Sequence, residues 1–245
     1  MSPSPTIVTM SEKVELPDSF KPEKIIGINN LKQISWLQRG LEISKSVCRL
    51  LTPSGLGTGF MIGSNCLMTN HHVIPDVDVA KESFAEFNYQ QDAAGGYLPT
   101  YRYRLQPIVF CTSPQEQLDY TIVSLEPNPD LPALDSWGRL SLNPTATPVP
   151  TEHVIIIQHP NGGLKQIVMT ANQVVNLKAQ YLHYTTDTMA GSSGSPVFND
   201  LWQVIAIHHA DGGIKQDKQG TNRHVNEGIL MSAIRPDAGN SWPQS

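Results

Sequence analysis

Three short segments contain residue types that could together carry out nucleophilic catalysis. The segments are 57–74 (GTGFMIGSNCLMTNHHVI), 117–125 (QLDYTIVSL) and 185–198 (TTDTMAGSSGSPVF). In chain order they supply His72, Asp119 and Ser193. A serine hydroxyl is a weak nucleophile at neutral pH, so it needs a base within hydrogen-bond reach, and that base needs a carboxylate to fix its tautomer. The three segments therefore predict serine-based catalysis with Ser193 as the nucleophile.

A nucleophilic serine also needs donors aimed at the oxyanion that forms on its substrate. Gly191 stands two residues before Ser193. A glycine at that position lets the backbone turn its N–H towards the developing charge. We therefore predict an oxyanion hole formed by the backbone N–H groups of Gly191 and Ser193.

Metal and nucleotide chemistry are less consistent with the sequence. GLGTG at 55–59 lacks the lysine of a phosphate-binding loop and the spacing of a dinucleotide fingerprint. The histidine pairs at 71–72 and 208–209 are adjacent in sequence. Neighbouring residues of a strand point to opposite faces, so neither pair is expected to chelate as a unit. The sequence predicts no metal and no cofactor.

The composition is that of an ordinary globular protein. The chain has 245 residues, 17 Lys+Arg against 22 Asp+Glu, and a net charge of −5. It has no run of basic residues, which argues against nucleic-acid binding. It has no apolar stretch of about 18 residues, which argues against a membrane span. Neither a secretory signal nor a cysteine pair with metal-type spacing is evident, so we expect a cytoplasmic protein with reduced thiols.

Short strands separated by turn clusters dominate the chain after residue 46, and they predict an all-β fold. The expected strands are Val47–Leu51, Gly59–Ile62, Cys66–Thr69, Ser83–Asn88, Tyr101–Val109, Tyr120–Leu125, Val154–Gln158, Gln166–Thr170, Leu182–Tyr184, Val197–Phe198 and Trp202–Ile207. This number of strands is more than one small barrel contains, so we expect two barrels. The Pro-rich stretch Asn143–Pro150 is the natural connection between them. The expected divisions are a leader with a helix (1–46), an N-terminal β-barrel (47–142) and a C-terminal β-barrel (143–245).

Before the strands, the sequence predicts one amphipathic helix from Ile28 to about Ser46, capped by Asn29 or Asn30. The residues expected on its apolar face are Ile28, Leu31, Ile34, Leu37, Leu41 and Ile43. Such a face either packs on the body of the protein or binds a partner protein, and packing is the more common outcome.

The local sequences resemble those of chymotrypsin-like (trypsin-like) serine proteases. Thr-Asn-His-His-Val (69–73), Leu-Asp-Tyr-Thr-Ile-Val (118–123) and Gly-Ser-Ser-Gly-Ser-Pro (191–196) resemble the segments around the catalytic histidine, aspartate and serine of that family. VIIIQHPNGG (154–163) and WQVIAIHHA (202–210) are similar to the bacterial branch that includes glutamyl endopeptidases. The resemblance extends from about Val47 to Ile234.

The resemblance implies two antiparallel six-stranded β-barrels with the active site in the cleft between them, and a serine endopeptidase that acts on protein or peptide substrates. It places His72 at the position of the catalytic base. His71 lies one residue before that position, and Ser192 and Ser195 only flank the position of the nucleophile. Asp119 has an alternative role as a strand cap.

The same resemblance implies a specificity pocket lined by Asp187, Thr188, His208 and Ala210. Thr188 and His208 match positions that glutamyl endopeptidases use to hold an acidic side chain, and both can donate hydrogen bonds to a carboxylate. Asp187 matches the position where trypsins bind Arg or Lys. The preference is expected to be acidic, with basic and small or apolar preferences left as alternatives.

Two functions remain open at this stage. One is a processing protease similar to the stand-alone or fused intracellular trypsin-like domains of bacteria. It would not use the ammonium switch of pancreatic zymogens, because Ser192 replaces the aspartate that such a switch requires. The other is a latent or inactive protease-fold module that binds a partner protein.

Overall fold

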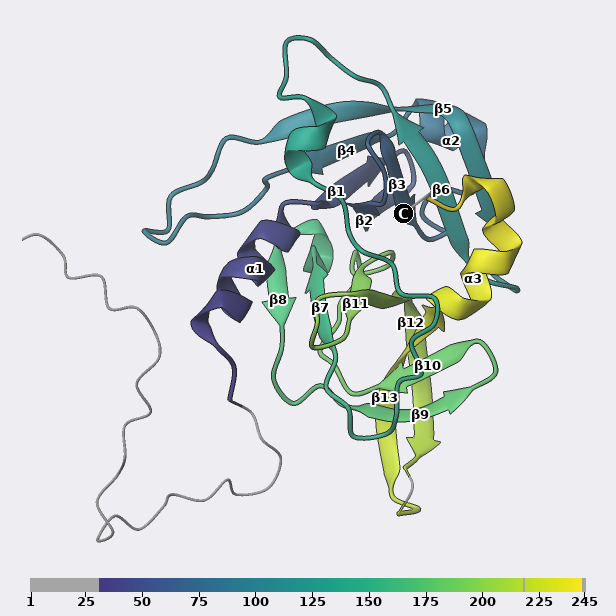
Figure 1. Cartoon of the computed structure of the whole chain (residues 1–245). Helices are drawn as coiled ribbons and strands as arrows, with labels where there is room; N and C mark the ends of the chain where they lie inside the picture. Colours follow the sequence, from purple (N-terminus) through teal and green to yellow (C-terminus); the bar gives the residue numbers. More distant parts are fainter. Residues whose placement is uncertain (1–30, 218, 244–245) are drawn as a thin grey trace, which may run out of the picture. The chain divides into compact units, whose positions relative to one another are not determined.

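The computed structural model describes residues 31–217 and 219–243 (Figure 1). The part of the predicted helix before residue 31, with its capping asparagines, lies outside the described residues. No helix in the described part of the chain has the length and apolar character needed to cross a lipid bilayer.

The first six strands form a closed antiparallel barrel in the order β1-β2-β3-β6-β5-β4. Their bounds are β1 Val47–Thr52, β2 Gly55–Met61, β3 Cys66–Thr69, β4 Phe84–Phe87, β5 Tyr101–Ser113 and β6 Tyr120–Leu125. Alternate residues of β6 point to opposite faces, as strand geometry requires. Val123 contributes to the core inside the barrel, whereas Tyr120 and Ile122 contribute to a second core shared with the other sheet. The predicted N-terminal barrel is confirmed.

The remaining strands form a seven-stranded sheet in the order β8-β7-β11-β12-β13-β10-β9. Their bounds are β7 Ile155–Gln158, β8 Gln166–Val168, β9 Val174–Lys178, β10 Tyr181–Tyr184, β11 Pro196–Phe198, β12 Val204–Gln216 and β13 Asn222–Leu230. The prediction of a second closed, six-stranded barrel is not confirmed, because the sheet has seven strands and no ladder among the described residues closes it. An isolated bridge between His153 and Gln173 links the segments before β7 and β9. Backbone N–H groups of Thr151 and Val154 donate to the carbonyls of Val174 and Asn172, so the two segments are joined over this short stretch.

A shared hydrophobic core holds the barrel against the sheet. Phe60 and Met68 from the barrel pack in one buried cluster with Ile157, Ile207 and other residues of the sheet. Apolar burial is worth roughly 25 cal/mol per Å², so this cluster stabilises one arrangement of the two halves. The predicted boundary between residues 142 and 143 falls in the segment that connects β6 to β7, and it stays a prediction.

Helix α1 (Ile34–Ser44) packs on the body of the protein, but of the predicted apolar face only Ile43 is among the residues that pack against the described core. Trp36 lies 4.7 Å from Trp202 between ring centroids, and Gly40 is buried against the same indole. Leu41, expected on the buried face, is 70% exposed. The prediction rested on aliphatic spacing alone and overlooked that a glycine allows close approach to a large aromatic side chain. Binding of a partner protein at this helix stays a prediction.

Two short helices and two of the strands did not emerge from the sequence pattern. Helix α2 (Val77–Lys81) is capped by the Asp76 side chain, which accepts hydrogen bonds from two backbone N–H groups. Helix α3 (Met231–Ala238) follows β13 directly. Strands β9 and β13 include polar and charged residues on their exposed faces, so they lacked the apolar runs by which the other strands were found.

Candidate active site

Two loops of the first barrel bring His72 and Asp119 together. His72 lies just after β3 ends at Thr69, and Asp119 immediately precedes β6. Asp119 is fully buried and has a φ of 39°, an uncommon value for a residue with a side chain. The Asn70 side chain supports this conformation, because its Nδ2 donates to the Asp119 carbonyl at 2.8 Å.

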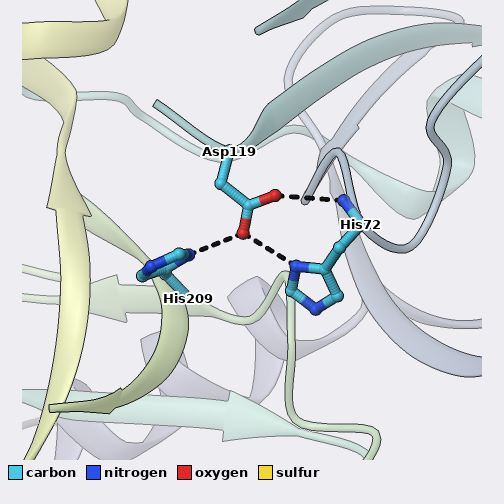
Figure 2. A group of neighbouring side chains, drawn as sticks. All are labelled: His72, Asp119 and His209. Carbon is cyan, nitrogen blue, oxygen red and sulfur yellow. Dashed lines mark hydrogen bonds and ion pairs between the residues drawn. The ribbon is translucent and has the colours of Figure 1, made fainter. Parts of the chain in front are cut away.

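The Asp119 carboxylate accepts hydrogen bonds from two histidines (Figure 2). Its Oδ1 accepts from the backbone N–H of His72 at 3.0 Å, and its Oδ2 lies 2.7 Å from His72 Nδ1. The same Oδ2 lies 2.6 Å from His209 Nδ1. Burial by itself raises the pKa of Asp119, but the hydrogen bonds from His209 and His72 outweigh burial and hold the pKa below its usual value. The carboxylate is therefore ionised and fixes an N–H at Nδ1 of His72.

Ser193 lies in the loop between β10 and β11, and it lines a cavity of about 200 Å³ together with His72. The described residues show no hydrogen bond between these two side chains. Catalytic hydrogen bonds are often long in unliganded enzymes and tighten when substrate binds. The structure thus brings His72 to Asp119 and places Ser193 on the same cavity.

The loop around Ser193 depends on two glycines with left-handed backbone. Gly191 has a φ of 88°, and a Cβ there would lie 2.7 Å from the backbone nitrogen of Gly162. Gly194 has a φ of 86°, and a Cβ there would lie 2.2 Å from the Thr58 carbonyl oxygen. Within the described part of the chain, the backbone N–H groups of Gly191 and Ser193 have no acceptor. These two predicted oxyanion donors are left available to a ligand.

The competing residues have other partners. His71 Nδ1 lies 2.8 Å from the Thr112 hydroxyl, away from Asp119. Ser195 is buried and donates its hydroxyl to the Ser192 carbonyl at 2.6 Å. Ser192 is also buried, and its hydroxyl accepts from the backbone N–H of Met189. These contacts engage His71, Ser192 and Ser195 in hydrogen bonds that do not involve His72, Asp119 or Ser193.

The four residues predicted to line the specificity pocket differ in their environments. His208 is buried, and its Nδ1 lies 2.9 Å from the Tyr184 hydroxyl. Burial, together with the nearby His209 and His72, lowers the pKa of His208 to about 3, so the ring is neutral at pH 7. The Thr188 hydroxyl donates to Asn226 at 3.0 Å. Asp187 is exposed and Ala210 is half-buried.

The neutral His208 predicts a loss of stability in acid. The pKa of His208 is about 3 in the folded protein against an ordinary 6.5, so the unfolded chain binds a proton first as the pH falls. This histidine's contribution to the free energy of unfolding is expected to fall by about 1.4 kcal/mol per pH unit between pH 6.5 and 3. Denaturant unfolding at pH 7 and pH 4.5 measures the slope. His208→Leu should have a shallower slope than wild type, and an equal slope would contradict this prediction. His224→Leu, at an exposed histidine, serves as the control.

His72, Asp119 and His209 also offer ligand atoms within 4.8 Å of one another, a spacing that a metal site would share. However, Nδ1 of each histidine lies 2.6–2.7 Å from one carboxylate oxygen. Those distances are typical of N–H···O⁻ hydrogen bonds. The arrangement is thus a hydrogen-bonded one, in which each Nδ1 carries a proton rather than a free lone pair.

Sequence reasoning missed His209 as a neighbour of the candidate site. It considered His209 only as a member of a histidine pair that could not chelate, and assigned a pocket role to His208 alone. The two do point apart, but a β-bulge between His208 and Ala210 inserts His209 as an extra residue in β12. Bulges redirect side chains at functional sites. The sequence offered one signal for this role: His209 directly follows His208, which was predicted to line the specificity pocket.

The comparisons with known proteins agree with this geometry. Residues 57–207 match the family described as trypsin-like peptidase domain. An uncharacterised protein of Sinorhizobium fredii, y4fB, is 40% identical over 205 residues, which cover 77% of this chain and 31% of that protein. Secreted RxLR effector protein 73 of Plasmopara viticola is 29% identical over 217 residues, which cover 78% of this chain and 52% of that protein. The chain thus spans about a third to a half of these relatives' length.

Solved structures of proteases have a similar fold. Rv3671c from M. tuberculosis H37Rv, in an inactive form, has a TM-score of 0.57 and 16% sequence identity, covering 84% of this chain and 92% of that chain. The structure of Glu endopeptidase in complex with MPD has a TM-score of 0.56 and 17% sequence identity, and the match covers 78% of this chain and 86% of that chain. At such identities the similarity concerns the fold alone.

Proposed function

Because the chain belongs to the trypsin-like peptidase family, we propose that it is a serine endopeptidase that hydrolyses peptide bonds of protein substrates through an acyl-enzyme on Ser193. The observation that carries the proposal is the hydrogen bond of His72 Nδ1 to the buried Asp119 carboxylate at 2.7 Å, beside a cavity that Ser193 also lines. Asp119 holds the proton of His72 on Nδ1, which leaves Nε2 as the basic atom.

In the proposed reaction, the Ser193 hydroxyl attacks the carbonyl carbon while His72 Nε2 takes its proton. The carbonyl oxygen becomes an oxyanion, which the N–H groups of Gly191 and Ser193 stabilise; one such donor is worth about 3 kcal/mol. His72 then returns the proton to the leaving amine as the C–N bond breaks. Water, deprotonated by His72, attacks the resulting ester, and His72 returns that proton to the Ser193 oxygen as the acid is released.

Labelling of the purified protein with a fluorophosphonate tests the proposal, because the probe reacts only with an activated serine. We expect one adduct, mapped to Ser193 by peptide mass spectrometry, and no adduct on Ser193→Ala. A folded wild-type protein that does not react would contradict the proposal. It would favour the alternative function, a latent protease-fold module that binds a partner protein.

For the substrate, we propose a preference for an acidic side chain before the scissile bond. When the Tyr184 hydroxyl donates to Nδ1 of His208, the ring's proton lies on Nε2 and is available to a substrate carboxylate. The exposure of Asp187 supports this preference, since an exposed carboxylate repels an acidic side chain less than a buried one. Thr188 and Ala210 would complete the pocket.

Cleavage of a peptide library measures this preference. We expect cleavage after Glu or Asp. His208→Leu should lower kcat/KM for the best acidic substrate by about 10- to 100-fold, the value of a hydrogen bond to a charged group. The same variant should leave kcat/KM for a peptide with an apolar residue at that position within a few-fold of wild type. Cleavage only after Arg or Lys would contradict the proposal and point to Asp187.

A selective pocket of this kind suits a processing protease. Cys48, Cys66 and Cys111 are free thiols. Unpaired thiols fit a reducing compartment, which supports processing of protein substrates in the cytoplasm.

A further inference from the structure

A chain of polar side chains continues from the His72–Asp119 pair into the second sheet. His209 Nδ1 lies 2.6 Å from Asp119 Oδ2, and His209 Nε2 lies 3.6 Å from Glu227 Oε1. The other oxygen of Glu227 lies 2.8 Å from His183 Nε2. The side chains of His209, Glu227 and His183 are 11%, 18% and 2% exposed. Four titratable groups beyond His72 are thus linked through largely buried contacts.

The register of three neighbouring strands builds this chain. In β10 and β13, His183 stands directly opposite Glu227. In β12 and β13, Glu227 pairs with Ala210, next to the bulge that contains His209. Cross-strand partners on one face lie close enough for their side chains to interact. Glu227 and the two histidines are therefore positioned by backbone pairing, and Asp119 approaches them from the loop before β6.

Hydrogen-bond partners fix the protons along the chain. An ionised carboxylate only accepts, so the close approach of both Nδ1 atoms to Asp119 Oδ2 requires an N–H on each. At the far end, Asn176 Nδ2 donates to the Gln216 carbonyl, which turns Oδ1 of Asn176 towards His183 Nδ1. His183 is therefore held between the Asn176 amide oxygen at 2.5 Å and the Glu227 carboxylate at 2.8 Å. This contact anchors Glu227 at the end of the chain.

We propose that His209 is a positioning residue of the active site: it holds the Asp119 carboxylate in place and competes with His72 for one carboxylate oxygen. Glu227, which His183 anchors, orients the His209 ring. This inference rests on the proposed function, because it assigns His209 a part in the same reaction. The effect reaches the substrate only through Asp119 and His72.

The surroundings of His209 determine what its removal does. The groups that face it are Asp119 from the loop before β6, Glu227 from β13, Tyr181 from β10, the adjacent His208, and His72 across the shared carboxylate. A donor on Asp119 withdraws negative charge that would otherwise stabilise protonated His72. Removing His209 is therefore expected to strengthen the interaction between Asp119 and a protonated His72 ring.

The test uses two variants of His209 and one matched control. His209→Leu removes both ring nitrogens. His209→Asn keeps an N–H donor near the place of Nδ1 but cannot reach Glu227. His224→Leu removes a histidine of β13 whose side chain is 69% exposed and pairs with Asp211. Steady-state kinetics from pH 5 to 9 and denaturant unfolding are measured for each full-length protein.

For His209→Leu we expect kcat to fall by about 10- to 100-fold, the effect of a slightly misplaced catalytic group, with KM unchanged. We expect the midpoint of the acidic limb of its pH–rate profile to move to higher pH. His209→Asn should recover most of kcat, and His224→Leu should match wild type. A purely structural His209 would leave the midpoint unchanged and give no recovery with Asn. Either of those results, in an active and folded protein, overturns the proposal.

Proton NMR of protein with ¹⁵N-labelled histidine separates this inference from the proposed function. Wild type is expected to show two low-field imidazole N–H signals, assigned to His72 and His209, and His209→Leu should lose one and shift the other. An inactive wild-type protein with both signals would contradict the proposed function while leaving the hydrogen-bonded chain intact. An active protein with a single low-field signal would contradict the inference alone.

Discussion

Ser193→Ala is expected to lower kcat by about a millionfold, to the residual rate that binding and the oxyanion donors alone support. The alanine removes the only atom that forms the acyl-enzyme, and His72 is left without a proton to accept. The free energy of unfolding should change little, because the Ser193 hydroxyl has no hydrogen-bond partner among the described residues. Turnover of the best library peptide, followed alongside denaturant unfolding, measures both quantities.

Ser232→Ala is the control for this experiment, since Ser232 is exposed on α3 and distant in sequence from the candidate site. It should retain wild-type kcat. If Ser193→Ala kept more than a thousandth of the wild-type kcat, another group would have to be the nucleophile, and the assignment of Ser193 would be wrong.

Asp119→Asn is expected to have the second largest effect, a decrease in kcat of about 10⁴-fold. The structure gives a specific reason, because three N–H groups donate to this carboxylate: the backbone and ring of His72, and the ring of His209. An asparagine has one oxygen for these donors. If its NH₂ group replaces Oδ2, it faces two ring N–H groups, and His72 must move its proton to Nε2 to accept from it. Nε2 then no longer acts as a base.

The opposite amide orientation places NH₂ against the backbone N–H of His72, so it costs stability as well. We therefore expect Asp119→Asn to lower the free energy of unfolding by about 1–3 kcal/mol, the cost of a buried donor without an acceptor. A pH–rate profile and an unfolding curve for this variant check the two effects. A kcat within tenfold of wild type would show that His72 does not depend on Asp119 for its tautomer.

Local sequence patterns predicted the first barrel well because its strands alternate in hydrophobicity or are continuously apolar. Tyr120–Leu125, for example, is buried on both faces and has the apolar composition expected of such a strand. The second sheet was harder to predict. Its β13 begins with Asn222, Arg223 and His224, which are exposed, and nothing in those residues indicates a strand.

In the candidate site too, local sequence motifs revealed some residues, whereas others depend on long-range contacts. The ordered segments around His72, Asp119 and Ser193 suggested the site, and the catalytic roles of these residues stay predictions. His209 was missed because its position depends on a one-residue bulge, and a bulge shifts the face on which a side chain lies. Glu227 and His183 were missed because their contact depends on strand pairing across 44 residues of sequence. Long-range register of this kind is set by tertiary packing rather than by local composition.

The division of the site between the two halves has a consequence for synthesis of the chain. His72 and Asp119 belong to the barrel, whereas Ser193, His209 and Glu227 come from strands and loops that are translated after it. The N-terminal half lacks the proposed nucleophile, Ser193. The C-terminal half lacks the proposed base, His72. In the proposed enzyme, hydrolytic capacity would thus arise only after the second sheet has been translated, so the nascent chain and its neighbours would be protected from earlier cleavage by the order in which the residues are encoded.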